Sequence, residues 1–157
     1  MDRVFLDTSF FVRLLDSTDE YHHFAKTYFT KFIQDDVEVI TSTIVLAEFG
    51  VKESIHFLPL DVLKILSFDY RHAEVCALFA KSAYEAKRKG AIDLKHRVLI
   101  PNDTKLFAQA EVQQATIFLG RDDGAKKVME FLLSESLMSC QYVDLRTPPN
   151  EFFGELF

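Results

Sequence analysis

Residues 1–15 of the chain read MDRVFLDTSFFVRLL, in which a charged residue, Asp7, stands between two apolar runs. The run from Arg3 to Leu6 predicts a short buried strand. Asp7 follows that strand directly, and a second apolar run begins at Phe10. Carboxylates avoid protein interiors unless a partner compensates their charge. Asp7 is therefore either a solvated turn residue or part of a site that requires negative charge.

The order of a short strand followed by helices recurs along the chain. Strands are predicted at 3–6, 38–40, 66–68, 115–119 and 141–145. Helices are predicted at 9–15, 44–55, 60–65, 72–89, 103–114 and 125–134. Such alternation is typical of an α/β fold, here a three-layer α/β/α arrangement with a short-stranded parallel central sheet. Two prolines at 148 and 149 separate a domain at 1–147 from a C-terminal tail at 148–157.

Composition limits the class of protein. The 157 residues, 48% of them hydrophobic, fit one compact domain with a full core, and sixteen Phe without Trp predict a core rich in phenylalanine. A net charge of −6 argues against a protein that coats nucleic acid through its overall charge. A cluster of metal-binding carboxylates would, however, make a nuclease acidic by itself. The two cysteines are expected to be free thiols, and the five histidines surface residues.

No stretch of the sequence approaches the roughly 20 apolar residues of a membrane span. The N-terminus also lacks the pattern of a signal peptide. We therefore expect a soluble cytoplasmic protein that does not contact a membrane.

Acidic residues follow two of the predicted strands. Asp7 comes after the first, and Asp122 and Asp123 come after the strand at 115–119. Parallel sheets form their sites outside the carboxyl ends of the strands, so these loops open at one edge if the strands are neighbours. For each acid taken alone, a loop position or a helix N-cap is the commoner explanation.

Glu48 is harder to explain as a surface residue. On a helix it shares a face with Ile44 and Val51, where an unpaired carboxylate would be costly. A buried ion pair with a residue such as Arg13 is the alternative, but a metal site is favoured over it.

Asp103 has a similar, weaker signal, because Leu106, Phe107 and Ala110 lie on its side of the predicted helix. It also stands in the predicted first turn, where an acid stabilises the helix dipole. The site and the dipole explanations are evenly matched for Asp103.

Taken together, these acids predict a cation site. Carboxylates packed within a few ångströms repel one another and need a counter-charge. Oxygen ligands alone suit Mg²⁺ or Mn²⁺, and no Cys or His spacing indicates zinc.

Four segments, FLDTSFFVRLL, TSTIVLAEFGV, NDTKLFAQA and IFLGRDD, resemble in their order and spacing the PIN domain, and within it the VapC-like toxins of toxin–antitoxin pairs. The resemblance covers the chain to about residue 145. It implies that Asp7, Glu48, Asp103 and Asp122 form an acidic quartet that holds Mg²⁺ or Mn²⁺. Asp7 and Asp103 would be direct ligands, and Glu48 and Asp122 would hold bound waters or a second ion.

The resemblance also implies an activity and partners. The expected reaction is endonucleolytic hydrolysis of RNA that leaves a 5′-phosphate and a 3′-hydroxyl. Such toxins usually form homodimers and are blocked by a small antitoxin protein. Ser9 matches a small polar position beside the metal, and Asp123 could share the role of Asp122.

Two features depart from the family pattern. Gly120 stands where relatives often have Thr or Ser, two residues before the fourth acid, and the missing hydroxyl could weaken the ordering of a metal-bound water. The stretch between Gly90 and Asp103 is also longer than usual. A catalytically weak or inactive PIN-like module that binds RNA or protein is therefore an alternative. A haloacid-dehalogenase-type phosphatase is a weaker one, because Ser9 stands where it would need a second acid.

Basic residues gather at 81–97, where six Lys or Arg face two acids. This run predicts either a phosphate-binding ridge for RNA or a solvated helix end, with neither favoured. The predicted RNA-binding residues are Arg13, Lys87, Arg88, Lys89, Lys95, Arg97 and Arg121.

The tail carries Phe152, Phe153 and Phe157 within its last residues. Fraying is usual for a terminus, but three phenylalanines favour docking on the domain, on a partner or on a second copy.

Overall fold

The structure of the protein is a computed structural model that describes residues 1–94 and 99–154, with side chains for 1–94 and 102–154. Its centre is a parallel sheet in the strand order β3-β2-β1-β4-β5. The strands are β1 (Arg3–Leu6), β2 (Glu38–Ser42), β3 (Lys64–Leu66), β4 (Ile117–Gly120) and β5 (Gln141–Asp144). The predicted α/β fold with a short-stranded parallel sheet is confirmed.

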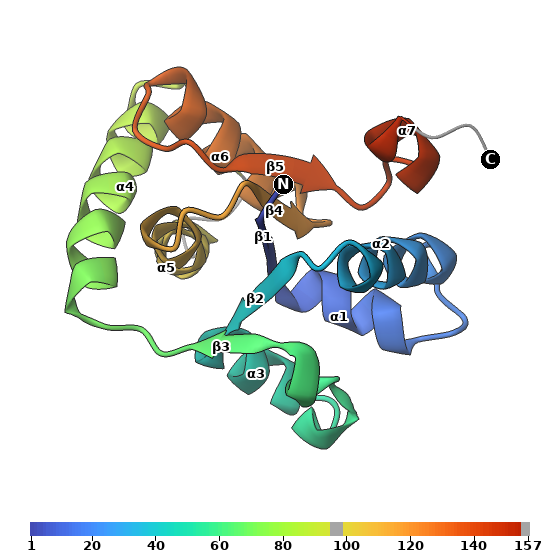
Figure 1. Cartoon of the computed structure of the whole chain (residues 1–157). Helices are drawn as coiled ribbons and strands as arrows, with labels where there is room; N and C mark the ends of the chain where they lie inside the picture. The colour runs from blue at the N-terminus through green and yellow to red at the C-terminus, as the bar shows by residue number, and fades with distance from the viewer. Residues whose placement is uncertain (95–98, 155–157) are drawn as a thin grey trace.

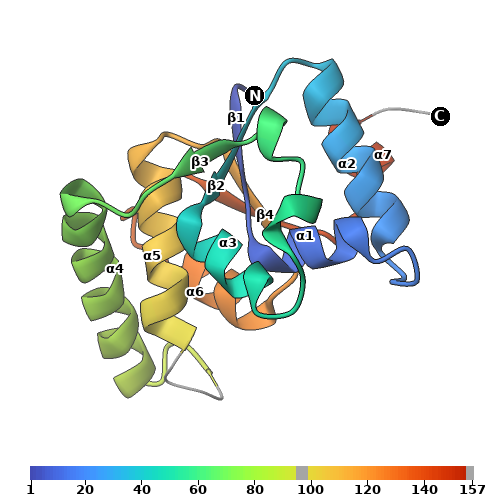
Figure 2. The ribbon, with the colours of Figure 1, turned by 90° about the horizontal axis from the view of Figure 1, so that it is seen from below.

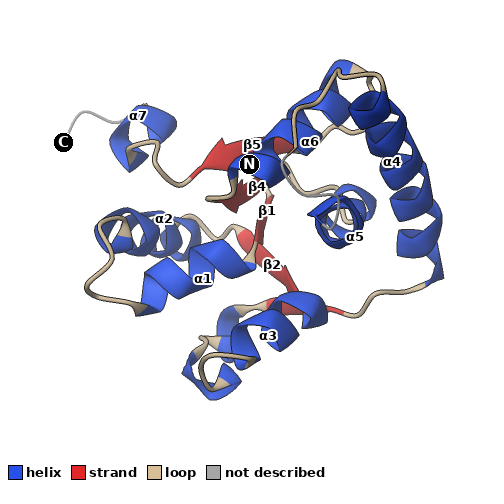
Figure 3. Ribbon diagram, turned by 180° about the vertical axis from the view of Figure 1, so that it is seen from behind, coloured by secondary structure: helices blue, strands red, loops and turns tan. Residues whose placement is uncertain are grey.

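Helices cover both faces of this sheet (Figures 1 and 3). One side carries α1 (Thr8–Leu15), α2 (His22–Gln34) and α3 (Thr43–Gly50). The other carries α4 (Tyr70–Arg88), α5 (Leu99–Val112) and α6 (Asp123–Ser134). Two 3₁₀ turns, η1 (Ile55–Phe57) and η2 (Leu60–Val62), precede β3, and α7 (Pro149–Phe153) ends the described chain. The two sides follow from the right-handed crossovers of parallel strands, which progress in opposite directions on either side of β1.

Phenylalanine rings fill the core between sheet and helices, as the composition predicts. Phe5 of β1 and Phe118 of β4 are paired in register and their rings stack at 5.1 Å. Phe107 of α5 packs edge-on against Phe118 at 5.1 Å, and all three rings are buried. Because β1 and β4 are neighbours, Asp7 and the loop after Gly120 open at the same edge of the sheet.

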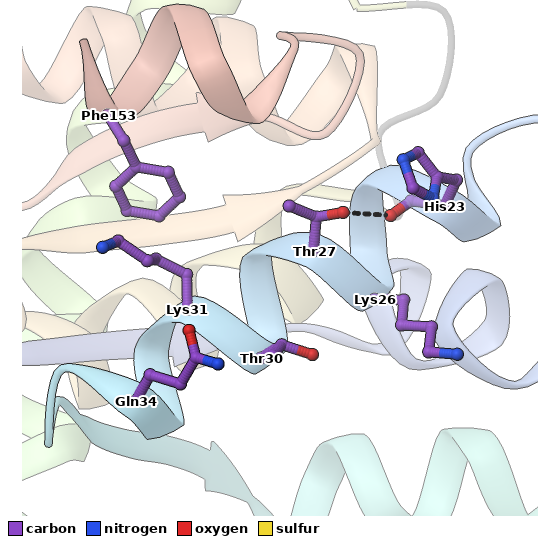
Figure 4. A pocket seen from close by; sticks show the side chains of 7 residues that line it. All are labelled: His23, Lys26, Thr27, Thr30, Lys31, Gln34 and Phe153. Atoms are coloured by element: carbon purple, nitrogen blue, oxygen red, sulfur yellow. Dashed lines mark hydrogen bonds between the residues drawn. The ribbon is translucent and has the colours of Figure 1, made fainter. Parts of the chain in front are cut away.

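The tail folds back on the domain through α7. Phe152 and Phe153 pack against Tyr28 of α2 at 5.6 and 5.5 Å, and Phe153 also meets Phe32 at 6.0 Å. The Tyr28 hydroxyl donates a hydrogen bond to the Thr147 carbonyl at 2.9 Å. Phe153 and the outer face of α2 border a cavity of about 360 Å³ (Figure 4). Phe157 lies outside the described residues.

Several boundaries differ from the sequence prediction, and the following differences are the largest. The third strand is Lys64–Leu66 rather than 66–68, and the helix expected at 60–65 is only the turn η2. Helix α3 ends at Gly50 instead of 55. Helix α5 begins at Leu99, so Pro101 lies inside its first turn rather than before it. Proline is tolerated there because the first N–H groups of a helix have no partner within it.

The titratable Cys and His residues follow the expectations in part. Cys76 and Cys140 are both free, with Cys140 buried and Cys76 half-buried. His72 is not a surface residue, because its side chain is buried and accepts a hydrogen bond from the Asp69 amide at the start of α4. No helix within the described residues is long and apolar enough to cross a membrane.

Candidate functional site

Asp7 lies at the junction of β1 and α1, where its carboxylate caps the helix. Its Oδ1 accepts hydrogen bonds from the Phe10 amide at 2.9 Å and from the Ser9 hydroxyl at 2.7 Å. The residue is only 7% exposed. Burial raises the pKa of Asp7 to about 6 against the effect of these hydrogen bonds, and repulsion by Asp122 adds to the rise. Asp7 is therefore an N-cap that is also buried, so the alternative of a solvated turn residue is wrong.

Gly120 lies directly beneath this carboxylate. A Cβ atom built on Gly120 would stand 2.5 Å from Asp7 Oδ2 and 2.8 Å from Asp7 Cγ. Ser9 connects the same two elements, because its hydroxyl donates to Asp7 and accepts from the Arg121 amide, both at 2.7 Å. Asp7 thus occupies the space that a side chain at 120 would need.

Asp103 is held by α5, one helical turn beyond the start of the helix. Its Oδ2 is buried and has no hydrogen-bond partner among the described residues. Burial raises the pKa of Asp103 to about 8, with further contributions from Asp122, Asp7 and Glu48 in that order. Because α5 begins at Leu99, Asp103 is past the first turn, and the dipole explanation loses its basis.

Glu48 of α3 is close enough to Asp103 to raise its pKa, but it does not lie on a buried face of its helix as the sequence predicts. It is exposed, because the face of α3 that enters the core carries Val45 and Phe49 instead. Val51, expected to share a buried face with Glu48, is 83% exposed and lies after the helix end. The apolar-stripe argument is therefore wrong, although the Glu48 charge acts on Asp103.

The contacts of Glu48 and Arg13 also argue against the alternative of an ion pair between them. The Thr8 hydroxyl donates a short hydrogen bond to the Glu48 carboxylate. Arg13 instead reaches Asp19, with 3.8 Å between Nε and Oδ2, and donates to the Ser9 carbonyl. The Glu48–Arg13 ion pair, the alternative to a metal site, is thus not formed, since Arg13 in the last turn of α1 contacts Asp19 in the loop between α1 and α2.

Asp122 and Asp123 have different environments. Asp122 caps α6 by accepting from the Ala125 amide at 2.7 Å, and its charge raises the pKa of both Asp7 and Asp103. Asp123 is exposed and paired with Arg146. The structure thus separates two neighbours that the sequence leaves equivalent.

Tyr142 of β5 fixes the backbone of the fourth acid. Its hydroxyl accepts from the Asp122 amide at 2.9 Å and donates to the Asp122 carbonyl at 3.2 Å. Tyr142 and Thr8 both hold candidate site residues, and neither was identified from the sequence. Thr8 could have been suspected from its place beside Asp7, whereas Tyr142 depends on β5 lying next to β4.

The donor set fits a hard divalent cation. All four acids offer oxygen atoms, and the buried Oδ2 of Asp103 has no hydrogen-bond partner in the part of the chain that the structure describes. Three of them raise the pKa of Asp103, as expected of like charges that lack a counter-ion. Within the described residues, no three His, Cys, Asp or Glu side chains are already drawn together as a metal-binding group. The acids are therefore coupled electrostatically rather than arranged as a closed chelate.

The predicted RNA-binding residues fall into two groups. The charge of Arg13 acts on the Asp7 carboxylate. Arg121 donates a hydrogen bond from its backbone amide to Ser9, while its guanidinium packs over the Tyr21 ring at 4.9 Å. Lys87, Arg88 and Lys89 form the end of α4, which Figure 2 shows on the same side of the molecule as the start of α5. Lys95 and Arg97 lie outside the described residues.

Comparison with solved structures identifies the fold. VapBC from Salmonella typhimurium bound to DNA matches with a TM-score of 0.56 and 17% identity, over 92% of this chain and 99% of that chain. VapBC2 from Rickettsia felis, bound to a promoter DNA fragment, matches with a TM-score of 0.54 and 17% identity, over 90% and 99%. VapC20 from Mycobacterium tuberculosis, a sarcin–ricin loop cleaving toxin, matches with a TM-score of 0.51 and 19% identity, over 78% of this chain and 92% of that chain.

A search of curated protein sequences found no match to this chain. A family model does match it: the PIN domain model covers residues 4–130, from the first strand to within α6. That span includes every acid of the candidate site. The chain belongs to the PIN domain family.

Proposed function

We propose that the protein is a metal-dependent endoribonuclease that hydrolyses RNA phosphodiester bonds. The observation that carries this proposal is the environment of Asp103. Its buried Oδ2 has no hydrogen-bond partner among the described residues, and burial and three acidic neighbours raise its pKa to about 8. A carboxylate in that position is stabilised by a cation and by little else. Mg²⁺ and Mn²⁺ are the cations that such oxygen ligands suit.

The four acids have separable roles in this proposal. A bound divalent ion supplies a hydroxide equivalent near neutral pH and offsets charge on the scissile phosphate. Asp7, which is buried, and Asp103, whose Oδ2 is buried, would hold the ion directly. Glu48 and Asp122 orient water molecules around it, and the exposed position of Glu48 suits that outer role. Ser9 keeps Asp7 in place through its hydroxyl.

RNA would reach this acidic site along basic side chains. Arg13, whose charge acts on Asp7, could contact phosphates next to the scissile bond. Arg121, whose backbone amide bonds to Ser9, is a further candidate. The exposed end of α4, with Arg88 and Lys89, offers further phosphate contacts. Such contacts position the RNA strand but do not distinguish its bases, so they do not determine which class of RNA is cleaved.

The sharpest test compares two adjacent aspartates. Total RNA and a single-stranded DNA of defined sequence are incubated with the protein and Mg²⁺ or Mn²⁺. Asp7→Asn and Asp122→Asn are expected to lower RNA cleavage at least about 100-fold, since each removes a charge from the cation site. Asp123→Asn is the matched control and keeps wild-type cleavage, because Asp123 is exposed and paired with Arg146. Equal cleavage by wild type and Asp7→Asn would contradict the proposal.

The alternative of an inactive PIN-like module predicts a different result of the same assay. RNA would be retained by the metal-loaded protein, but no cleavage would appear with either ion. The phosphatase alternative is set aside by the family match.

We further propose that the protein is a toxin held inactive by a small antitoxin. A groove of about 760 Å³ between α1, α3 and η1 supports this, because it shares Thr8 and Glu48 with the candidate site. Exposed apolar side chains border it, including Leu15 at 40% and Phe57 at 64% exposure. A partner helix in this groove would bury those side chains and cover the carboxylates.

Partner and assembly can be tested together. Co-expression with the product of a neighbouring short reading frame is expected to give a stable complex that does not cleave RNA. Leu15→Glu, in the groove, weakens that complex, whereas Leu78→Glu on the exposed face of α4 does not. Light scattering of the free protein is expected to give the mass of a homodimer. Fractionation of cells is expected to place the protein in the cytoplasm.

A further inference from the structure

Gly120 and Asp7 meet at the point where β4 and β1 end side by side. The three atoms nearest to a Cβ built on Gly120 all belong to the Asp7 carboxyl group, at 2.5, 2.8 and 3.1 Å. Contacts below 3.0 Å are not found for real Cβ atoms, so the carboxylate would have to move. A Cβ at Gly50, by contrast, meets only the Ile55 side chain, at 3.3 Å.

The Asp7 carboxylate cannot move without losing hydrogen bonds. Its Oδ1 accepts from both the Phe10 amide and the Ser9 hydroxyl. The same Ser9 hydroxyl accepts from the Arg121 amide, directly after Gly120. Residues of α1 thus hold the carboxylate on one side, while on its other side it lies against Gly120 of β4, which has no side chain.

We propose that Gly120 is the positioning residue that gives Asp7 its place in the cation site. The hydroxyl that orders this part of the site comes from Ser9 on α1, and the β4 position has to stay without a side chain. A hydroxyl restored at position 120 would then displace Asp7 and weaken cation binding. The inference rests on the proposed cation site and predicts the opposite of what the family pattern implies for Gly120.

Divalent-ion affinity measures the effect without any RNA. Binding of Mn²⁺ is followed by the loss of the electron paramagnetic resonance signal of the free ion, below the unfolding temperature of each variant. Gly120→Ala and Gly120→Ser are expected to bind Mn²⁺ about 10- to 100-fold more weakly than wild type. Gly50→Ala, the matched glycine variant, is expected to bind as wild type. Affinity for Mn²⁺ in Gly120→Ser equal to or above that of wild type would overturn the proposal.

A thermal double-mutant cycle tests whether the effect passes through Asp7. Gly120→Ala is expected to lower the melting temperature of the metal-free wild type by about 2–4 °C, the size of a lost helix cap. In an Asp7→Ala background the same substitution is expected to have almost no effect, because the three clashing atoms are gone. An equal loss in both backgrounds would overturn the proposal.

The two measurements also separate this inference from the proposed function. If the wild type binds no Mn²⁺, the proposed cation site fails, and the thermal cycle alone decides whether Gly120 positions Asp7. If the wild type and Gly120→Ser bind Mn²⁺ equally well, the proposed cation site is supported and the proposed role of Gly120 is wrong.

Discussion

The candidate site and the α2–α7 junction are built on opposite physical principles. At the site, Asp7 and Asp103 are removed from water while nearby carboxylates repel them. At the junction, Tyr28, Phe32 and Phe153 bring aromatic rings together at 5.5–6.0 Å. The first region raises the free energy of the folded metal-free chain, and the second lowers it.

This difference shows that the junction stabilises the fold, whereas the candidate site destabilises it in the absence of a metal ion. Buried like charges without a counter-ion persist only when other parts of the fold stabilise the structure. Removing a buried carboxylate charge at the site and removing a buried ring at the junction should therefore change stability in opposite directions.

The largest effect is expected at Phe32, whose ring is fully buried in the junction. Phe32→Ala removes the ring and leaves a cavity, so the free energy of unfolding should fall by roughly 3–5 kcal/mol. Urea unfolding followed by circular dichroism measures this. Ile33→Ala is the matched control, since its side chain is 43% exposed and should change stability by no more than about 0.5 kcal/mol. Similar losses in both variants would contradict the assignment of the junction as core.

The next effect concerns the tail. A chain ending at Thr147 loses α7 and with it the contacts of Phe152 and Phe153 on Tyr28. These rings are half-buried, so we expect a loss of about 2 kcal/mol in stability with unchanged Mn²⁺ affinity. Unchanged stability would mean that the boundary between 147 and 148 separates an independent tail.

At the site the expected sign reverses. Asp103→Asn removes a repelled charge, so at pH 9 without divalent ions it should stabilise the protein by about 1 kcal/mol. At pH 5 the gain should disappear, because Asp103, with a pKa of about 8, is already neutral in the folded wild type. Asp123→Asn, at an exposed ion pair, should not stabilise at either pH. Thermal unfolding with a chelator present tests this, and a destabilised Asp103→Asn at pH 9 would contradict it.

The pH dependence of the wild type follows from the same groups. The folded-state pKa values of Asp7 and Asp103, about 6 and about 8, lie above the ordinary value of 3.8. The folded chain therefore binds more protons, and stability falls as pH rises from about 4 through about 8. Saturating Mn²⁺ should reverse the trend, because the ion binds the ionised carboxylates. A metal-free melting temperature that rises over this range would contradict the raised pKa values.

The smallest effect is expected at Tyr142. Tyr142→Phe removes the hydroxyl that bonds to the amide and carbonyl of Asp122, at a cost of about 1 kcal/mol. Tyr84→Phe is the control, since that side chain is 40% exposed and should leave stability unchanged. Mn²⁺ affinity should fall in the first variant only.

The fold could be predicted from the sequence because its signals are local. Apolar runs mark β1 and β4, and the order of strands and helices limits the topology to a few arrangements. The start of α5 was missed because Pro101 is usually taken as a helix boundary, although a first turn tolerates it. Boundaries depend on such single turns, whereas the architecture does not.

The site could be predicted only as far as residue types allow. The acids stood out because carboxylates beside apolar runs are unusual, and the structure couples four of them. Glu48 was selected for a wrong reason, since helical spacing alone does not say that α3 buries Val45 and Phe49. The separation of Asp122 from Asp123 depends on Arg146, and the role of Gly120 depends on the distance between two strands. Tertiary contacts of this kind leave no periodic signal in a sequence.

The pairing of β1 with β4 has a consequence for protein synthesis. Phe5 lies opposite Phe118, so the first strand cannot pair with this neighbour until more than a hundred further residues have been synthesised. A nascent chain that has not yet reached Asp122 cannot assemble the four acids, whatever else has folded. Under the proposed function, the nascent enzyme would stay inactive until β4 and Asp122 have left the ribosome and β4 has paired with β1.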